Sequence, residues 1–132
     1  MSFWRKEGST SDLTRGQRRA LEEFAELRIS LEDLRRRLHG VLEFDFKDQE
    51  RSLKTHYGGT PTPGVRIELE HIREAMEKHA REEVSTHDLA DWATMLLLND
   101  AYDWEGPDEE KIADWLNEIS ILTLRTNNEA GE

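Results

Sequence analysis

The chain has 132 residues, with 18 basic and 29 acidic side chains, a formal net charge of −11 and no cysteine. This length is typical of one domain, and the lack of cysteine excludes disulfides, thiolate nucleophiles and cysteine-held zinc or iron–sulfur sites. The longest strictly apolar run, residues 95–98, is far shorter than the roughly 20 residues of a membrane span. The N-terminus also lacks the apolar segment of a secretory signal. We therefore expect a cytoplasmic protein without membrane contact.

The N-terminal third predicts two helices. Residues 1–10 are expected to form a flexible leader, and a helical pattern begins near Ser11 or Asp12. A second helix is expected to begin at Ser30, whose hydroxyl can accept a backbone N–H, with Asp33 in the capping-box position. Apolar residues at helical spacing mark the buried faces of both helices: Ala20, Leu21, Phe24, Ala25, Leu27, Leu31, Leu34 and Leu38.

The middle of the chain is harder to assign. Residues 41–47 alternate between apolar and charged side chains, which is typical of a strand, although positions 38, 42 and 46 also fit a helix. Residues 48–57 are polar and are expected to form a short helix. The segment 58–64, with four glycines or prolines among its first six positions and a final glycine, predicts a linker between two helical halves.

The C-terminal half predicts three more helices. The first is expected over residues 68–82, and the next begins at Ser85 and should be central, because its apolar stripe extends to residue 98. Pro107 fits the first helical position of the last helix. Residues 121–125 could extend that helix or form a strand, and 126–132 are expected to be a flexible tail.

These patterns predict a mainly α fold, a single small helical domain of four to six helices over residues 11–125. A short two-stranded β-ribbon between 41–47 and 65–69 is compatible with it. The expected core comprises Leu21, Phe24, Leu34, Leu38, Ile72, Met76, Leu89, Trp92, Leu96, Ile112, Trp115 and Leu116.

Residues 29–34 and 84–89 resemble one another. Each has an apolar residue, a serine at a helix start, an acid three positions later and then a leucine. Shared capping chemistry is enough to explain the similarity, and a duplication is not required.

Charge is concentrated in the C-terminal third. Residues 85–132 carry 2 basic and 12 acidic side chains, whereas residues 1–64 carry 12 and 11. Such a field repels phosphate backbones and attracts basic protein surfaces, so nucleic-acid binding is not expected.

The loop 99–110 is therefore the candidate partner-binding surface, with seven candidate residues: Asp100, Tyr102, Asp103, Trp104, Glu105, Asp108 and Glu109. The alternative for Tyr102 and Trp104 is that both fold inward and close the core.

No motif predicts catalysis or a cofactor. With Gly106 as the sixth position of an EF-hand loop, the first and twelfth positions would be Ala101 and Ile112, neither of which binds calcium. The five histidines are scattered without metal-site spacing. We expect no catalytic residues, no bound metal and no cofactor.

The segment 84–115 resembles part of a group of small, uncharacterised bacterial helical proteins. It pairs a helix begun by Ser85 and carrying Trp92 and Ala93 with an acidic loop and a helix containing Ile112-Ala113-Asp114. The Ser-started helices and acidic balance are also similar to colicin-type immunity proteins, which neutralise a basic toxin domain. This resemblance implies a small helical fold and a basic protein partner, and it assigns no functional residue.

The leading hypothesis is a non-enzymatic acidic protein-binding module that docks a basic protein, with an immunity-like inhibitor as one version. One alternative is a metal-binding protein or metal-dependent hydrolase that uses the acidic loop 99–110. The other is a helical protein that self-associates through the broad stripe of residues 89–98.

Overall fold

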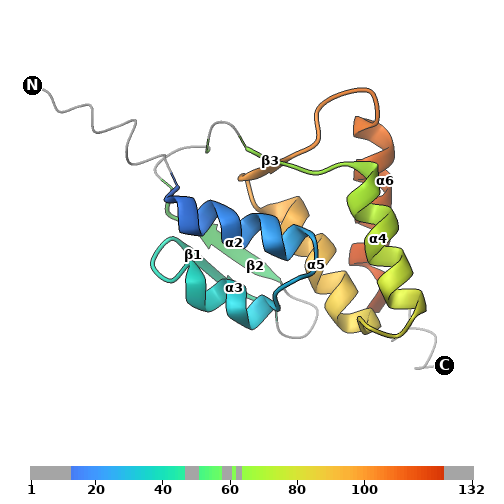
Figure 1. The fold of residues 1–132 in the computed structure, drawn as a ribbon, viewed down its shortest axis with the longest axis horizontal. Helices are drawn as coiled ribbons and strands as arrows, with labels where there is room; N and C mark the ends of the chain where they lie inside the picture. Colours follow the sequence, from blue (N-terminus) through green and yellow to red (C-terminus); the bar gives the residue numbers. More distant parts are fainter. Residues whose placement is uncertain (1–12, 47–50, 58–60, 62–63, 124–132) are drawn as a thin grey trace, which may run out of the picture.

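A computed structural model describes residues 13–46, 51–57, 61 and 64–123, which form five helices and four short strands (Figure 1). The mainly α fold predicted from the sequence is confirmed. None of the helices in these ranges is long and apolar enough to cross a membrane. In chain order the elements are α2 (Arg15–Ala25), α3 (Leu31–Arg37), β1 (Leu42–Asp45), β2 (Ser52–Thr55), β3 (Val65–Arg66), α4 (Leu69–Ala80), α5 (Thr86–Leu98), β4 (Tyr102–Asp103) and α6 (Glu109–Ser120).

Helix α5 is the centre of the domain, as its broad apolar stripe predicted. Every residue from Leu89 to Leu96 is buried, and α5 packs against α2, α4 and α6. The fully buried Trp92 donates its indole N–H to the carbonyl of Ala25, 3.1 Å away. This bond satisfies a carbonyl in the last turn of α2 and joins the two helical halves of the chain.

Helices α2 and α3 form a hairpin whose boundaries follow from local capping. Thr14 and Gln17 make a capping box at the start of α2, so the described helix begins at Arg15. The earlier start expected near Ser11 lies outside the described residues. Ser30 and Asp33 form the predicted capping box of α3.

The strands pair differently from the predicted ribbon. β1 pairs antiparallel with β2, with Leu42 opposite Thr55, and so residues 41–47 contain a strand and 52–55 are not helical. β3 pairs in parallel with β4 instead, through the N–H of Val65 to the carbonyl of Ala101 at 2.6 Å. The predicted pairing of 41–47 with 65–69 is wrong, because β1 finds a partner close by in the chain, which costs less loop-closure entropy.

The helices of the C-terminal half are shorter than predicted at two ends. α4 ends at Ala80 and not at residue 82, and α6 begins at Glu109 with Asp108 as its N-cap. Pro107 therefore precedes the helix and does not occupy its first position. Leu122 and Thr123 continue in helical geometry, so the described part of 121–125 contains no strand. Most of the predicted linker 58–64, like the predicted leader and tail, lies outside the described residues.

The core agrees closely with the predicted set of twelve residues, with two exceptions. Met76 is only partly buried. Trp115 is 47% exposed, and its prediction as a core residue is wrong. It shares spacing with Ile112 and Ile119, but it lies at the edge of their stripe and not at its centre. Ten of the predicted core residues are buried: Leu21, Phe24, Leu34, Leu38, Ile72, Leu89, Trp92, Leu96, Ile112 and Leu116.

Candidate protein-binding surface

The acidic loop after α5 is fixed at its base by buried polar contacts. The side-chain oxygen of Asn99 accepts from the N–H of Ala101 at 3.0 Å and from the hydroxyl of Tyr57 at 2.9 Å. Burial raises the pKa of Tyr57 to about 12, so its hydroxyl stays a neutral donor. These buried hydrogen bonds therefore fix the direction in which the loop leaves the core.

Tyr102 belongs to the core and not to the surface. Its side chain is buried, and its hydroxyl donates to the carbonyl of Leu21 at 2.7 Å. Burial raises the pKa of Tyr102 well above its usual value. Tyr102 therefore follows the alternative prediction, in which the side chain folds inward and closes the core. Its prediction as a partner-binding residue is corrected. A buried hydroxyl needs a partner, and β4 places it beside the last turns of α2.

Trp104 takes an intermediate position. It is partly buried against the core and lines a polar hollow of about 290 Å³ with Arg66, Pro107 and Ile112. This hollow lies between the segments that begin α4 and α6. Trp104 therefore closes the end of the core while leaving part of its ring accessible.

The carboxylates of this loop are exposed and mostly lack ion pairs. In the described ranges, no ion pair joins Asp100, Glu105, Asp108 or Glu109 to a cation, and Asp103 lies 3.7 Å from Arg66. Because Asp100, Glu105, Asp108 and Glu109 have no ion pair among the described residues, the field of these four charges extends into solvent over about one Debye length, roughly 8 Å at physiological salt.

The acids of α4 behave differently. Glu70 and Glu77 pair with Arg73 on the same helix, and Glu83 pairs with Arg81 just after it. The hydrogen bond from Arg73 lowers the pKa of Glu70, and the bond from Arg81 likewise lowers that of Glu83. Three acids on or just after α4 thus have arginine partners, whereas four of the five loop carboxylates have no ion pair among the described residues.

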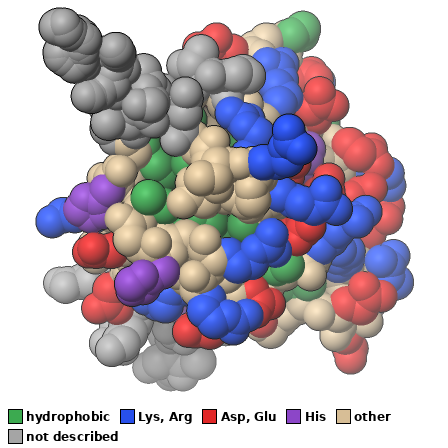
Figure 2. Space-filling model, turned by 60° about the vertical axis from the view of Figure 1, so that its left-hand side comes forward, with side chains coloured by type: hydrophobic (Ala, Val, Ile, Leu, Met, Phe, Trp, Pro, Cys, Tyr) green, Lys and Arg blue, Asp and Glu red, His purple; other side chains and the backbone are tan. Residues whose placement is uncertain are grey.

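The basic side chains of α2 and α3 are also engaged within the chain. Figure 2 shows the side of the molecule that carries them, with basic side chains gathered in a band and acidic ones interleaved. Arg37 lies 2.9 Å from Glu23, and Arg36 pairs with Asp33. Arg35 stacks 4.2 Å from the centre of the Phe44 ring and donates to its carbonyl. These contacts favour the interpretation of the arginine cluster as a solvated helix face.

Trp115 is an aromatic surface group that the sequence pattern missed. It lies on α6 in a shallow hollow of about 230 Å³ lined also by Lys111, Asp114 and Glu118. An exposed tryptophan ringed by charge is typical of an interface anchor. The only sequence signal for its exposure is the polar character of the residues three and four positions away, Lys111 and Glu118.

A buried ion pair was also missed. Arg51 and Asp91 have side chains only 9% and 7% exposed, and Arg51 Nη2 lies 3.1 Å from Asp91 Oδ1. Arg51 further donates to the carbonyl of Ser120 at 3.1 Å, and His87 Nε2 lies 3.3 Å from Asp91 Oδ2. This group ties the start of β2 to α5 and to the end of α6, which is a structural role. Asp91 lies in a largely apolar helix, and the polar residues near it in the sequence do not indicate that it forms a buried ion pair.

The two alternative functions find less support in this geometry. Across the ranges that the structure describes, no three His, Asp or Glu side chains converge as metal ligands would. The stripe proposed for self-association is covered within the chain over residues 89–96, and Leu98 alone in it is largely exposed, at 45%.

Comparison with known proteins gives no relative from which a function could be transferred. The chain matches no protein-family model, and no curated protein and no solved structure shows a significant match to it. The chemistry of its surface is therefore the only guide to the function of this chain.

Proposed function

We propose that the chain is a non-enzymatic protein-binding module that docks a basic protein through an acidic surface, defined as Asp100, Asp103, Glu105, Asp108 and Glu109. The observation that carries the proposal is the concentration of carboxylates on this one loop, four of which have no ion pair among the described residues, whereas Glu70, Glu77 and Glu83 pair with arginines on or just after α4. An immunity-like inhibitor of a basic protein is one concrete version.

Exposed charge of this kind mainly affects the rate at which the protein and its partner encounter one another. Complementary charges steer association and can raise its rate by one to three orders of magnitude at low salt. Affinity needs a desolvated anchor as well. Trp115 supplies a candidate on α6, the helix that begins at Glu109, and the accessible part of Trp104 supplies a second.

The test is affinity capture from the native host with tagged protein, at low and then moderate salt, followed by mass spectrometry. We expect one basic protein that is released as salt rises, because screened charges no longer hold it. Its association rate should then be measured with a variant in which four acids become amides. We expect about a tenfold slower association at low salt. The substitutions are Asp103→Asn, Glu105→Gln, Asp108→Asn and Glu109→Gln.

A matched control distinguishes the effect of the acidic surface from the effect of the protein's net charge. A second variant removes four acids from α4 and its following turn, so that both variants carry the same net charge. We expect this control to bind the partner nearly as fast as the wild type. Equal binding by all three proteins would show that the acidic surface does not dock the partner. The control substitutions are Glu70→Gln, Glu74→Gln, Glu77→Gln and Glu83→Gln.

A further inference from the structure

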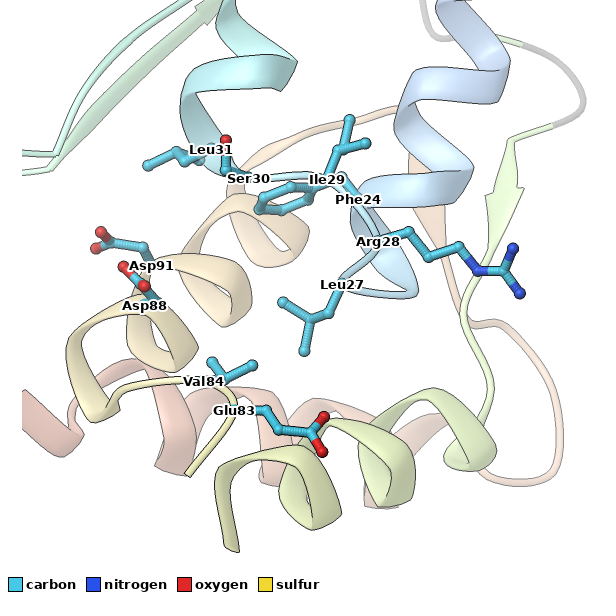
Figure 3. Close-up of a pocket in the computed structure, with 10 residues that line it drawn as sticks. All are labelled: Phe24, Leu27, Arg28, Ile29, Ser30, Leu31, Glu83, Val84, Asp88 and Asp91. Carbon is cyan, nitrogen blue, oxygen red and sulfur yellow. The ribbon is translucent and has the colours of Figure 1, made fainter. Parts of the chain in front are cut away.

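The pocket between the α2–α3 turn and the α4–α5 turn is not a candidate binding site, because its buried acid already has partners. The pocket has a volume of about 260 Å³, and Phe24 and Val84 lie in its middle (Figure 3). Asp91 at its rim lies 3.1 Å from Arg51 and 3.3 Å from His87. Unused hydrogen-bonding groups lie elsewhere, on the β1–β2 hairpin.

The two strands of this hairpin bond to each other through alternate residues. In an antiparallel ladder, pairs that exchange hydrogen bonds alternate with pairs whose N–H and C=O groups point away from the partner strand. The N–H of His56 donates to the carbonyl of Val41 at 2.9 Å, and the register of the hairpin places these two residues opposite each other. The backbone groups of Leu53 and Thr55 in β2 therefore point away from β1.

The two outer edges of the hairpin differ. On β1, the N–H of Leu42 donates to the carbonyl of Leu38 at 3.0 Å, and the carbonyl of Phe44 accepts from Arg35 at 3.1 Å. On β2, no hydrogen bond within the described part of the chain reaches the outward backbone groups. β2 is thus the open edge of this sheet, and such an edge is a template for a further strand.

Both faces of β2 can continue into a further strand. Leu53 is partly buried and packs against the core beside its cross-strand partner Phe44. Ser52 and Lys54 are exposed on the opposite face. A shallow hollow of about 380 Å³ on the hairpin is lined by residues of β1 and β2 alone. A strand added to β2 would therefore extend an apolar row on one face and a polar row on the other.

We infer that the open edge of β2 pairs with β2 of a second copy of this chain, antiparallel and with Leu53 opposite Leu53 of that copy. A two-fold contact of this kind uses the same strand twice, as most homodimers do. This surface is separate from the acidic surface and from the stripe of residues 89–98, so the inference and the proposed function can fail independently.

The register follows from charge. Outward groups must meet outward groups, so a two-fold axis within β2 can lie at residue 53, 54 or 55. An axis at residue 54 places Lys54 opposite Lys54 of the second copy, and an axis at residue 55 places it opposite His56. Like charges directly opposite one another destabilise a strand pair. Only the axis at Leu53 places Lys54 opposite Ser52, and it joins the two apolar rows.

Cysteine cross-linking tests this register, because the chain contains no cysteine of its own. Hydrogen-bonded pairs in antiparallel strands have Cα atoms about 5.5 Å apart, within reach of a disulfide. Under mild oxidation we expect full-length Leu53→Cys to form a covalent dimer about tenfold faster than Lys54→Cys. Lys54 is the more exposed side chain, so random collisions would give the opposite order.

A charge variant tests the pairing without cysteine. Sedimentation of the wild type should show a monomer–dimer equilibrium with a dissociation constant on the order of 100 μM, because the interface is small. Ser52→Lys places a lysine opposite Lys54 of the second copy at two symmetric positions and should weaken the dimer about fivefold. Asn117→Lys, with the same net charge, is the control on α6 and should leave the dimer unchanged.

Three results would overturn the inference. The first is a wild type that stays monomeric at about 1 mM. The second is cross-linking of Lys54→Cys as fast as that of Leu53→Cys. The third is equal weakening of the dimer by Asn117→Lys and Ser52→Lys. Circular dichroism of each dilute variant confirms that it is folded, and Ser52→Lys changes an exposed side chain, so it tests the inference even if Leu53→Cys does not fold.

Discussion

Replacing Arg51 with methionine should destabilise the fold by about 3–5 kcal/mol, because it leaves Asp91 as a buried carboxylate without its main counter-charge. At the 3.1 Å between the two charged atoms, the gross attraction is about 5 kcal/mol at an effective dielectric constant of 20. Methionine keeps most of the stem, so the change isolates the charge and the bonds to Ser120 and Thr123. The midpoint of thermal unfolding should fall by roughly 10–20 °C.

The pH dependence of this effect has a definite sign. Burial raises the pKa of Asp91 above its usual 3.8, although His87 and Arg51 both act to lower it. A folded-state pKa above the unfolded value means that the contribution of Asp91 is most favourable below the unfolded pKa. That contribution is lost as pH rises through the folded pKa. Without Arg51 the pKa of Asp91 rises further, and the stability deficit of the variant should shrink as pH falls from about 7 to about 5.

Urea unfolding at both pH values measures these quantities, with Asp91→Leu and the double variant completing a cycle. Removing both charges should restore stability to within about 1 kcal/mol of the wild type or exceed it, since a buried pair is often no better than apolar packing. The reasoning would be refuted if Arg51→Met cost less than about 1 kcal/mol at pH 7 and its deficit did not change with pH.

Three further outcomes follow from single residues. Glu82→Gly should stabilise the protein by about 0.5–1 kcal/mol in urea unfolding, because Glu82 is exposed with φ of 64°, a conformation that glycine adopts without strain. Tyr102→Phe should destabilise it by about 0.5–1.5 kcal/mol in the same assay, because the buried hydrogen bond from its hydroxyl to the carbonyl of Leu21 is lost. Trp115→Ala should change the unfolding free energy by less than about 1 kcal/mol, since the ring is 47% exposed, but it should weaken partner capture measurably.

What could be predicted from the sequence is what depends on neighbours in the chain. Ser30 and Ser85 cap helices as expected, because a hydroxyl three positions from a free N–H needs no tertiary information. The centrality of α5 was also predictable, since a helix apolar on most of its surface must be covered on most of it.

What could not be predicted depends on distant parts of the chain. The parallel pairing of Val65 with Tyr102 brings together residues far apart in sequence, and each strand has only two residues, too few for a periodic signal. The same distinction between local and distant determinants applies to the candidate site. The acidic character of the loop is visible in the sequence, but the burial of Tyr102 and the exposure of Trp115 are set by packing, which periodicity at the edge of a stripe does not resolve.

The similarity of residues 29–34 and 84–89 extends, in the structure, to the turns that precede them. Capping chemistry explains the serines, but it does not explain why Leu27 and Glu82 occupy positions that favour glycine. For Glu82, which is exposed, nothing in the described contacts offsets that strain, and glycine should stabilise. Leu27 instead packs against the core. Leu27→Gly should therefore destabilise the protein by about 0.5–1 kcal/mol, since the loss of apolar contact outweighs the relief of strain. Opposite signs for the two substitutions in urea unfolding would show that the contacts of Leu27 hold it in a strained conformation. Equal signs would show that the backbone conformation of the turn alone determines how glycine changes the stability.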